Sequence, residues 1–200
     1  MSPLAATADE QLMRAYATGQ AAAFETLYDR HSARVWRYIL RSTGDAAAAD
    51  DLAQEVWFSV AREAGRYAPR ASAPDRPLAR FTTWLFTLAR HRVIDHLRAR
   101  RPQASLDAPV GEGDDTLADT LAAPSGFGPV RRIETRQQAA QLLAALDALP
   151  PEQREAFLLQ AEADMSVADI ASTTGVPFET ARSRLRYARA ALRRTLEAMA

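Results

Sequence analysis

The 200-residue sequence contains no cysteine, no lysine and no asparagine. Without cysteine the chain can form no disulfide, no thiolate zinc site and no cysteine nucleophile. Because lysine is absent, all 25 basic side chains are arginines. No run of about 18 apolar residues occurs, so we expect no membrane insertion. Residues 1–8 show no basic segment followed by an apolar stretch, which favours a cytoplasmic protein without a secretory signal.

Sequence motifs of enzymes and cofactor-binding proteins are also missing. The chain has no glycine-rich phosphate loop, no Gly-x-Ser-x-Gly elbow and no paired acid motif. His91 and His96 are five residues apart, which places them on different faces of a helix, and no carboxylate–histidine set has the spacing of metal ligands. We therefore expect no catalytic activity, no cofactor and no metal.

The charged residues are strongly segregated along the chain, although the formal net charge is zero. Residues 61–101 hold ten arginines against three acids, and residues 181–200 hold six against one. The intervening residues 102–130 hold five acids and no arginine. Such alternating blocks are typical of separate interaction surfaces, and the two basic blocks favour nucleic acid as a partner. The alternative is that the basic blocks are ordinary solvated helices.

Helical periodicity dominates the sequence and no strand pattern stands out, so we predict an all-α fold. Apolar residues recur at three- and four-residue steps from Phe24 to Ile39, and Gly44 follows as a stop signal. A further helix is predicted over residues 81–101, with apolar side chains all round, which indicates packing on more than one side. Residues 102–130 lose the periodicity and are rich in proline and acid. They predict a flexible acidic linker between two small helical domains, residues 1–101 and 131–200.

The second domain has the pattern of a helix-turn-helix. Ser166 and Asp169 form a potential capping box that starts a short helix over residues 167–173. Gly175 supplies a turn, and a longer helix ends near Glu197. On that last helix an apolar stripe is predicted to face the core: Phe178, Ala181, Leu185, Ala188, Leu192 and Leu196.

A second stripe of the last helix consists of arginines: Arg182, Arg186, Arg189 and Arg193. Residues 180–196 contain no acid, whereas a merely solvated face would normally include glutamates paired with the arginines. An apolar seam beside an arginine stripe suits a helix in the DNA major groove, where arginine binds phosphates or guanine.

Two further surfaces are candidates for binding. The first surface is a group of arginines close in sequence to aromatic side chains and a histidine: Arg90, Arg92, Arg98, Arg100 and Arg101 with Tyr67, Trp84 and His91. Basic and aromatic side chains together suit the binding of single-stranded nucleic acid. A helix around residues 50–57 buries Leu52 and Val56 and exposes Asp51, Gln54, Glu55 and Phe58. This outer face could serve a protein partner or be ordinary solvated surface.

Three collinear segments together resemble the bacterial RNA polymerase sigma factors of the sigma-70 family, in the extracytoplasmic-function group. The segments run from Asp50 to Trp57, from Phe81 to Arg101, and from Leu149 to Leu185. The chain departs from the family pattern at a few places. His91 stands where the family has a base-reading asparagine, Tyr187 stands where arginine is frequent, and the loop over residues 65–80 is long and proline-rich.

The resemblance implies a factor that binds core RNA polymerase, recognises the −10 and −35 promoter elements and directs initiation, with an anti-sigma factor as a further partner. The implied core-polymerase-binding residues are Asp50, Asp51, Gln54 and Glu55. The implied −10 residues are Tyr67, Arg90, His91, Arg92, Asp95, Arg98, Arg100 and Arg101. The implied −35 residues are Thr180, Arg182, Ser183, Arg186, Tyr187 and Arg189. The alternative is a free-standing helix-turn-helix repressor that acts without polymerase.

Overall fold

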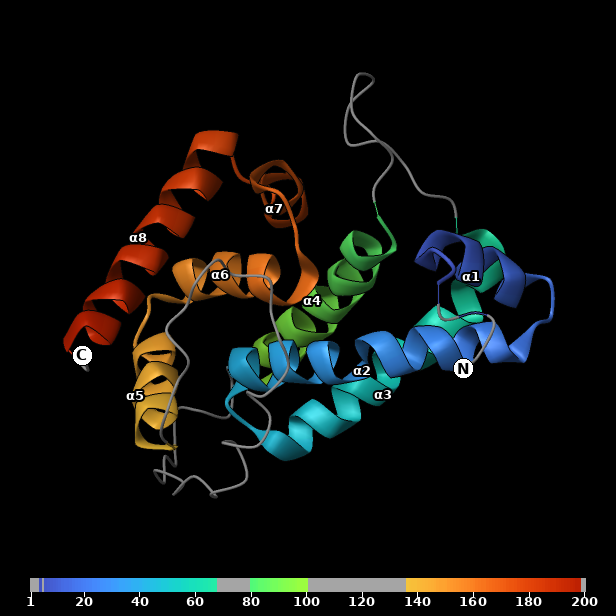
Figure 1. Cartoon of the computed structure of the whole chain (residues 1–200), viewed down its shortest axis with the longest axis horizontal. Coiled ribbons are helices and arrows are strands. Elements are labelled where there is room, and N and C mark those ends of the chain that lie inside the picture. Colours follow the sequence, from blue (N-terminus) through green and yellow to red (C-terminus); the bar gives the residue numbers. More distant parts are fainter. Residues whose placement is uncertain (1–3, 5, 68–79, 101–135, 199–200) are drawn as a thin grey trace.

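The computed structural model describes residues 4, 6–67, 80–100 and 136–198, and every regular element in these ranges is helical (Figure 1). The all-α prediction is thereby confirmed. The helices are α1 (Asp9–Ala17), α2 (Ala21–Thr43), α3 (Ala46–Glu63), the 3₁₀ turn η1 (Ala64–Arg66), α4 (Phe81–Arg100), α5 (Arg136–Asp147), α6 (Pro151–Ala163), α7 (Val167–Thr174) and α8 (Phe178–Ala198). The expected linker over residues 102–130 lies outside the described residues.

The turn between α2 and α3 follows directly from its sequence. Gly44 ends α2 in the left-handed conformation, with φ of 71°, and its N–H donates to the carbonyl of Leu40 at 2.8 Å. Glycine adopts this conformation at little cost, so α2 ends where the sequence predicts that it should. Asp45 then caps α3 by accepting a hydrogen bond from the amide of Ala48. That bond, assisted by Arg100, lowers the pKa of the Asp45 carboxyl.

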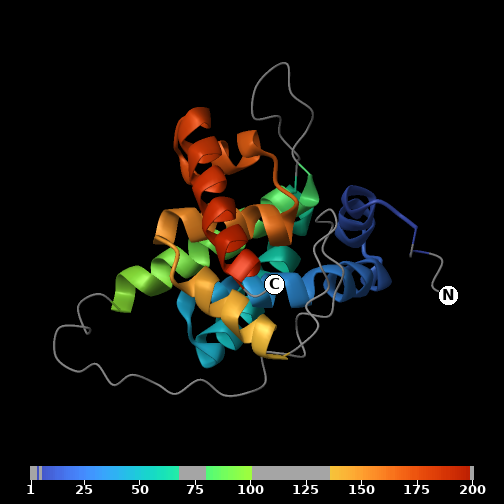
Figure 2. The same cartoon turned by 60° about the vertical axis from the view of Figure 1, so that its left-hand side comes forward.

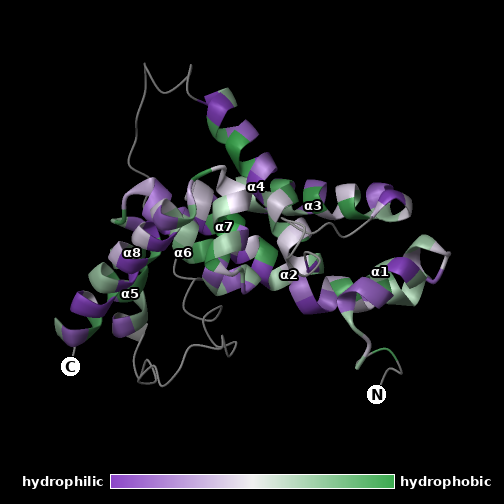
Figure 3. Ribbon diagram, turned by 90° about the horizontal axis from the view of Figure 1, so that it is seen from above, coloured by the Kyte–Doolittle hydropathy of each residue, from purple (hydrophilic) through white to green (hydrophobic). Residues whose placement is uncertain are grey.

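The core of the first half forms where α4 packs against α2 and α3. Phe86 of α4 lies edge-on to Tyr38 of α2, with ring centroids 5.5 Å apart, and both side chains are fully buried. α4 also contacts α6, so the prediction that this helix packs on more than one side is confirmed. Beyond Val93 the helix emerges from the core, and its last turns project from the body of the molecule (Figure 3).

The helix α1 is attached to α2 by a cluster of charged side chains around Asp9. One carboxylate oxygen of Asp9 accepts from Arg30 at 2.5 Å, and the other lies 2.7 Å from Nε2 of buried His31. Partial burial alone would raise the pKa of Asp9, but hydrogen bonds and charge attraction from His31 and Arg30 outweigh it. The pKa of Asp9 therefore lies below its usual value.

This pKa shift makes stability depend on pH. Because the pKa of Asp9 is lower in the folded chain, its contribution is complete above about pH 4 and is lost as the pH falls through the folded value. We expect Asp9→Asn to lower the free energy of unfolding at pH 7 by about 1.5–3 kcal/mol, the usual range for hydrogen bonds to charged groups. Denaturant titrations from pH 7 to pH 3 should show the difference from the natural chain shrinking below about pH 4. Asp29→Asn, at an exposed position of α2, serves as control; an equal loss there would contradict the prediction.

The second half contains the predicted helix-turn-helix. Ser166 and Asp169 form a complete capping box at the start of α7, and Gly175 ends α7 with φ of 71°. On α8 the buried stripe comprises Ala181, Leu185, Ala188 and Leu192. The expectation that Phe178 belongs to this stripe is wrong. Phe178 is the first residue of α8, at the edge of the packed region, and 46% of its surface is exposed.

The two halves of the chain are docked on each other. α6 lies across α2 and α4, whereas α5 and α8 lie on the far side of α6 and α1 lies at the opposite end of the molecule (Figures 1 and 2). The sequence suggested two domains joined by a tether and gave no sign of this contact. Within the described ranges, no helix combines the length and apolar character needed to span a bilayer.

Candidate protein and nucleic-acid interfaces

The outer face of α3 combines acidic, amide and aromatic side chains. Asp51, Gln54, Glu55 and Phe58 are exposed, and Phe58 shows 63% of its surface. The opposite face of α3 buries Leu52, Val56 and Trp57. The four exposed residues follow one another at steps of one, three or four, so they form one continuous surface.

Asp50 differs from its neighbours because it already has a partner within the fold. Its Oδ1 accepts a hydrogen bond from the indole N–H of Trp36 at 2.7 Å. The side chain therefore helps to hold α3 against α2. Among the described residues, the exposed side chains of Asp51 and Gln54 form no ion pair or hydrogen bond, whereas Glu55, the remaining predicted polymerase-binding residue, lies 3.6 Å from Arg92.

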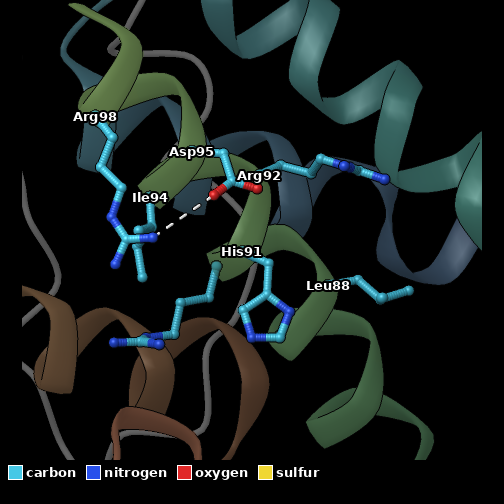
Figure 4. A pocket seen from close by; sticks show the side chains of 7 residues that line it. Leu88, His91, Arg92, Ile94, Asp95 and Arg98 are labelled. Atoms are coloured by element: carbon cyan, nitrogen blue, oxygen red, sulfur yellow. Dashed lines mark ion pairs between the residues drawn. The ribbon is translucent and has the colours of Figure 1, made fainter.

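On α4, His91, Asp95 and Arg98 lie on one exposed side of the helix (Figure 4). These three residues border an open hollow of about 530 Å³. The rest of its lining comes from the same helix: Leu88, Arg90, Arg92 and Ile94. Arg98 and Asp95 form a loose ion pair of 3.9 Å, and both side chains are largely solvated. A cation and an imidazole beside an open hollow can bind a phosphate and contact a base edge.

Two predicted DNA-binding arginines of α4 are instead engaged with the protein. Nε of Arg90 donates to Glu155 of α6 at 2.9 Å, and only 16% of the Arg90 side chain is exposed. Arg92 extends toward α3, where it donates to the hydroxyl of Ser59 at 3.0 Å and approaches Glu55 (Figure 4). The structure thus brings Arg92, predicted to bind DNA, next to Glu55, predicted to bind polymerase.

The remaining predicted residues of this region vary in accessibility. Arg100 is exposed and pairs with Asp45 at 2.9 Å, whereas Arg101 lies outside the described residues. The ring of Tyr67 packs against Phe81 and Trp84, with centroids 6.0 and 5.0 Å away. Its hydroxyl is buried without a partner among the described residues, and burial raises the pKa of Tyr67 to about 12. Tyr67 is therefore part of a packed aromatic cluster in this conformation.

The arginine stripe of α8 faces solvent. Arg182 is two-thirds exposed and lies 3.7 Å from Glu179. The guanidinium of Arg186 stacks over the Tyr187 ring at 4.9 Å and donates to the Tyr187 hydroxyl at 3.1 Å. Arg189 donates to Gln160 of α6. This stripe is an extended cationic surface with one exposed aromatic ring in it.

The hydroxyl groups beside the stripe are less available. Ser183 Oγ donates to the carbonyl of Thr180 at 2.9 Å, and both residues are half-buried. Ser183 can still accept a hydrogen bond through its remaining lone pair. In the part of the chain that the structure describes, no three histidine, aspartate or glutamate side chains come together as potential metal ligands.

Comparison with known proteins agrees with this arrangement. Residues 27–103 match the family model for Sigma-70 region 2, and residues 139–192 match that for Sigma-70, region 4. The chain is 36% identical to the ECF RNA polymerase sigma factor SigL of Mycobacterium tuberculosis over 90% of this chain and 93% of that protein. It is 34% identical to the RNA polymerase sigma factor CarQ of Myxococcus xanthus over 86% and 88% of the two chains. The sigma factor RpoE of Bartonella quintana, solved with the anti-sigma factor NepR, shares the fold with a TM-score of 0.62 at 20% identity, covering 87% of this chain and 96% of that one.

The chain therefore belongs to the sigma-70 family of RNA polymerase sigma factors, in the extracytoplasmic-function group. The two matched regions correspond to the two halves that contain α2–α4 and α5–α8. The resemblance drawn from the three sequence segments is confirmed.

Sequence reasoning missed a set of arginines on α2. Arg34, Arg37 and Arg41 form ion pairs with acids of the second half of the chain. Their periodic spacing was visible, but their partners lie more than 100 residues away, so only the fold reveals the pairing.

Proposed function

We propose that this sigma factor binds core RNA polymerase through the outer face of α3 and contacts promoter DNA at two places. In this proposal α4 contacts the melted −10 element and α8 contacts the −35 element. The observation that carries it is the distribution of exposed charge: an acidic and aromatic face on α3, and arginine surfaces on α4 and α8. Cationic surfaces bind the phosphate backbone, whereas the mixed face of α3 suits a protein.

The same proposal assigns the two halves of the chain to separate tasks. Residues 1–101 form the polymerase-binding and −10-binding unit, residues 102–130 link the units, and residues 131–200 form the −35-binding unit. In this proposal the chain carries out no catalytic chemistry of its own and works in the cytoplasm. An anti-sigma factor is a further proposed partner, supported by the family resemblance and by the solved complex of the Bartonella protein with NepR.

A free-standing helix-turn-helix repressor is not favoured. Such a repressor needs only the second half of the chain and a dimerisation surface. The chain also contains the Sigma-70 region 2 match over residues 27–103, which a simple repressor would not use.

Reconstitution with purified core RNA polymerase tests the proposal directly. We expect transcripts that start at one position downstream of paired −10 and −35 elements, and only when the chain, core enzyme and both elements are present. A template with both elements scrambled provides the control. Binding to the promoter without any transcript in the presence of core enzyme would contradict the proposal and favour a repressor.

His91 provides a test of base recognition in the −10 element. An asparagine side chain offers an adjacent donor and acceptor that can pair with two atoms of one base edge. A neutral imidazole has its donor and acceptor on opposite sides of the ring, so it cannot make that contact. We therefore expect His91→Asn to sharpen or change the preference at one −10 position by about 1–3 kcal/mol, the usual range for a bidentate base contact.

Transcription from a template library that carries every base at each −10 position measures this preference. His96→Asn is the matched control, because His96 lies on α4 but lines neither the hollow nor the exposed side around His91. Identical base profiles for the natural chain and His91→Asn would mean that His91 does not read a base.

A further inference from the structure

The exposed face of α8 carries one acidic side chain among its arginines. Glu179 is the second residue of α8, and the other acid of this helix, Glu197, lies in its last turn. Arg182 and Arg186 follow Glu179 at steps of three and seven residues, which places the three side chains on one face of the helix. The buried stripe of α8 lies on a different side.

The Glu179 side chain is largely solvated and only loosely paired. It is 76% exposed, and its carboxylate lies 3.7 Å from Nη1 of Arg182, which is itself 67% exposed. Among the described residues the carboxylate has no other ion pair or hydrogen bond. An exposed pair of this kind contributes little to stability, because water and salt screen it. Both groups can therefore turn toward a ligand.

A carboxylate in this place opposes binding to DNA in general. The arginine stripe attracts the phosphate backbone, and a negative charge beside it repels the same phosphates. This cost applies to every DNA sequence alike, unless a hydrogen-bond donor of the DNA lies opposite the carboxylate. Such an acid therefore raises specificity when one sequence offers the donor and the others do not.

The base edges of the major groove offer hydrogen-bond donors of one kind, the amino groups of cytosine and adenine. Guanine and thymine present acceptors at the corresponding edge, and these repel a carboxylate. In helix-turn-helix proteins the first residues of the recognition helix contact the base edges. Glu179 lies in that part of α8, and the usual base partner of glutamate is N4 of cytosine.

We propose that Glu179 is a specificity-determining residue of the −35 interface and that its carboxylate accepts a hydrogen bond from the amino group of a cytosine. Arg182 lies beside it, so the pair presents donors next to an acceptor. The edge of a G·C base pair has the complementary pattern, with two acceptors on guanine and a donor on cytosine. This proposal rests on the proposed contact of α8 with the −35 element.

A purely structural role of Glu179 makes different predictions. An acid in the first turn interacts favourably with the helix dipole, and the pair with Arg182 supports the same turn. Both effects stabilise the free protein, and neither depends on the DNA sequence. The base preference of the complex therefore separates the two roles.

The experiment measures base preference in the complex of the full-length chain with core RNA polymerase. Fluorescence anisotropy reports binding to duplexes that carry every base at each −35 position, and thermal melting is recorded for the chain alone. Glu179→Ala removes the carboxylate, and Glu179→Gln replaces it with an amide of the same shape. Glu197→Ala is the matched control, because it removes the same charge from an exposed position at the other end of α8.

We expect the natural chain and Glu197→Ala to prefer cytosine at one −35 position, and Glu179→Ala to weaken this preference by about tenfold. Glu179→Ala should at the same time bind a scrambled −35 duplex more tightly than the natural chain does, because the repulsive charge is gone. Glu179→Gln should change the preference at that position from cytosine to adenine, since an amide pairs with N6 and N7 of adenine.

Identical base profiles for the natural chain and Glu179→Ala would overturn the proposal, even if the affinity for all duplexes rises or the melting temperature falls. An equal change in Glu197→Ala would overturn it as well, because the effect would then be one of net charge. Failure of the proposed −35 role is recognised separately. In that case Arg182→Ala and Arg186→Ala leave binding to every duplex unchanged, whereas they weaken it when only the role of Glu179 is wrong.

Discussion

Replacing Asp51 and Gln54 together with alanine is expected to weaken binding to core RNA polymerase about 30-fold or more while leaving thermal stability unchanged. Both side chains are exposed on the outer face of α3, and the residues that hold α3 in place, Leu52 and Val56, point the other way. Interface residues of this kind contribute about 1–3 kcal/mol each when they are hot spots, and 2 kcal/mol corresponds to about 30-fold in affinity.

Phe58 is expected to add to this effect. An aromatic side chain that is 63% exposed on the same face loses water contact when a partner covers it, and aromatic residues are common at the centres of interfaces. Phe58→Ala should therefore reduce affinity for core polymerase by about tenfold or more, without lowering the melting temperature.

The control for both measurements is Glu25→Ala with Asp29→Ala, which alters two exposed positions of α2 away from this face. Fluorescence titration with core enzyme and thermal melting should be performed on the same samples. Unchanged affinity in the Asp51/Gln54 variant would show that this face of α3 does not bind polymerase. A fall in melting temperature would show that the residues stabilise the fold.

Local signals in the sequence predicted the helices where capping and periodicity are strong. Two kinds of local signal mark helix ends. Glycine adopts the positive φ that ends α2 at Gly44 and α7 at Gly175, and the Ser166–Asp169 box satisfies the free amides at the start of α7. Helix α1 was missed, since it has only nine residues and buries only Leu12 and Met13. It is held by Asp9, whose partners Arg30 and His31 lie on the next helix.

The candidate site was predictable in its residue types and less so in its contacts. The exposure of Gln54 on α3 and of His91 on α4 follows from the helical period, because the apolar residues of each helix define its buried side. The pairing of Arg90 with Glu155 does not follow, since 65 residues separate the two and either could equally have remained solvated. Tyr67 likewise could not be assigned to the Phe81–Trp84 cluster from its place in the sequence, because it follows the 3₁₀ turn η1 and lies on no helical period.

Replacing Arg182 or Arg186 with alanine is expected to weaken binding of the full-length chain to −35 duplex DNA and to reduce its salt dependence. Each phosphate-binding arginine that is removed should lower the slope of log K against log salt by about one unit. Arg182 and Arg186 are both exposed on α8. They lie toward the start of the helix, the end that contacts base edges in helix-turn-helix proteins.

The two arginines are expected to differ in what they recognise. Arg182 lies near Glu179, whose charge opposes DNA binding until the loose ion pair opens. Arg186 is already held against Tyr187 by stacking and a hydrogen bond, so it loses less conformational freedom when it binds. If Arg186 contacts a guanine, Arg186→Ala should relax the preference at a single −35 position by about 1–3 kcal/mol, whereas loss of a phosphate contact should weaken all sequences equally.

Arg194→Ala is the matched control, because it removes the same charge from the same helix but lies near its other end, beside Leu149 and Pro150 in the groove between α5 and α8. Binding should be measured by fluorescence anisotropy at several salt concentrations, with the natural −35 sequence and with each single-base variant. The arginine stripe would be ordinary solvated surface if Arg182→Ala and Arg186→Ala changed the salt slope no more than Arg194→Ala does. If only Arg182→Ala and Arg186→Ala lower the salt slope, the −35 element contacts the first turns of α8, because the phosphate contacts that release counterions are then made by these two arginines and not by Arg194.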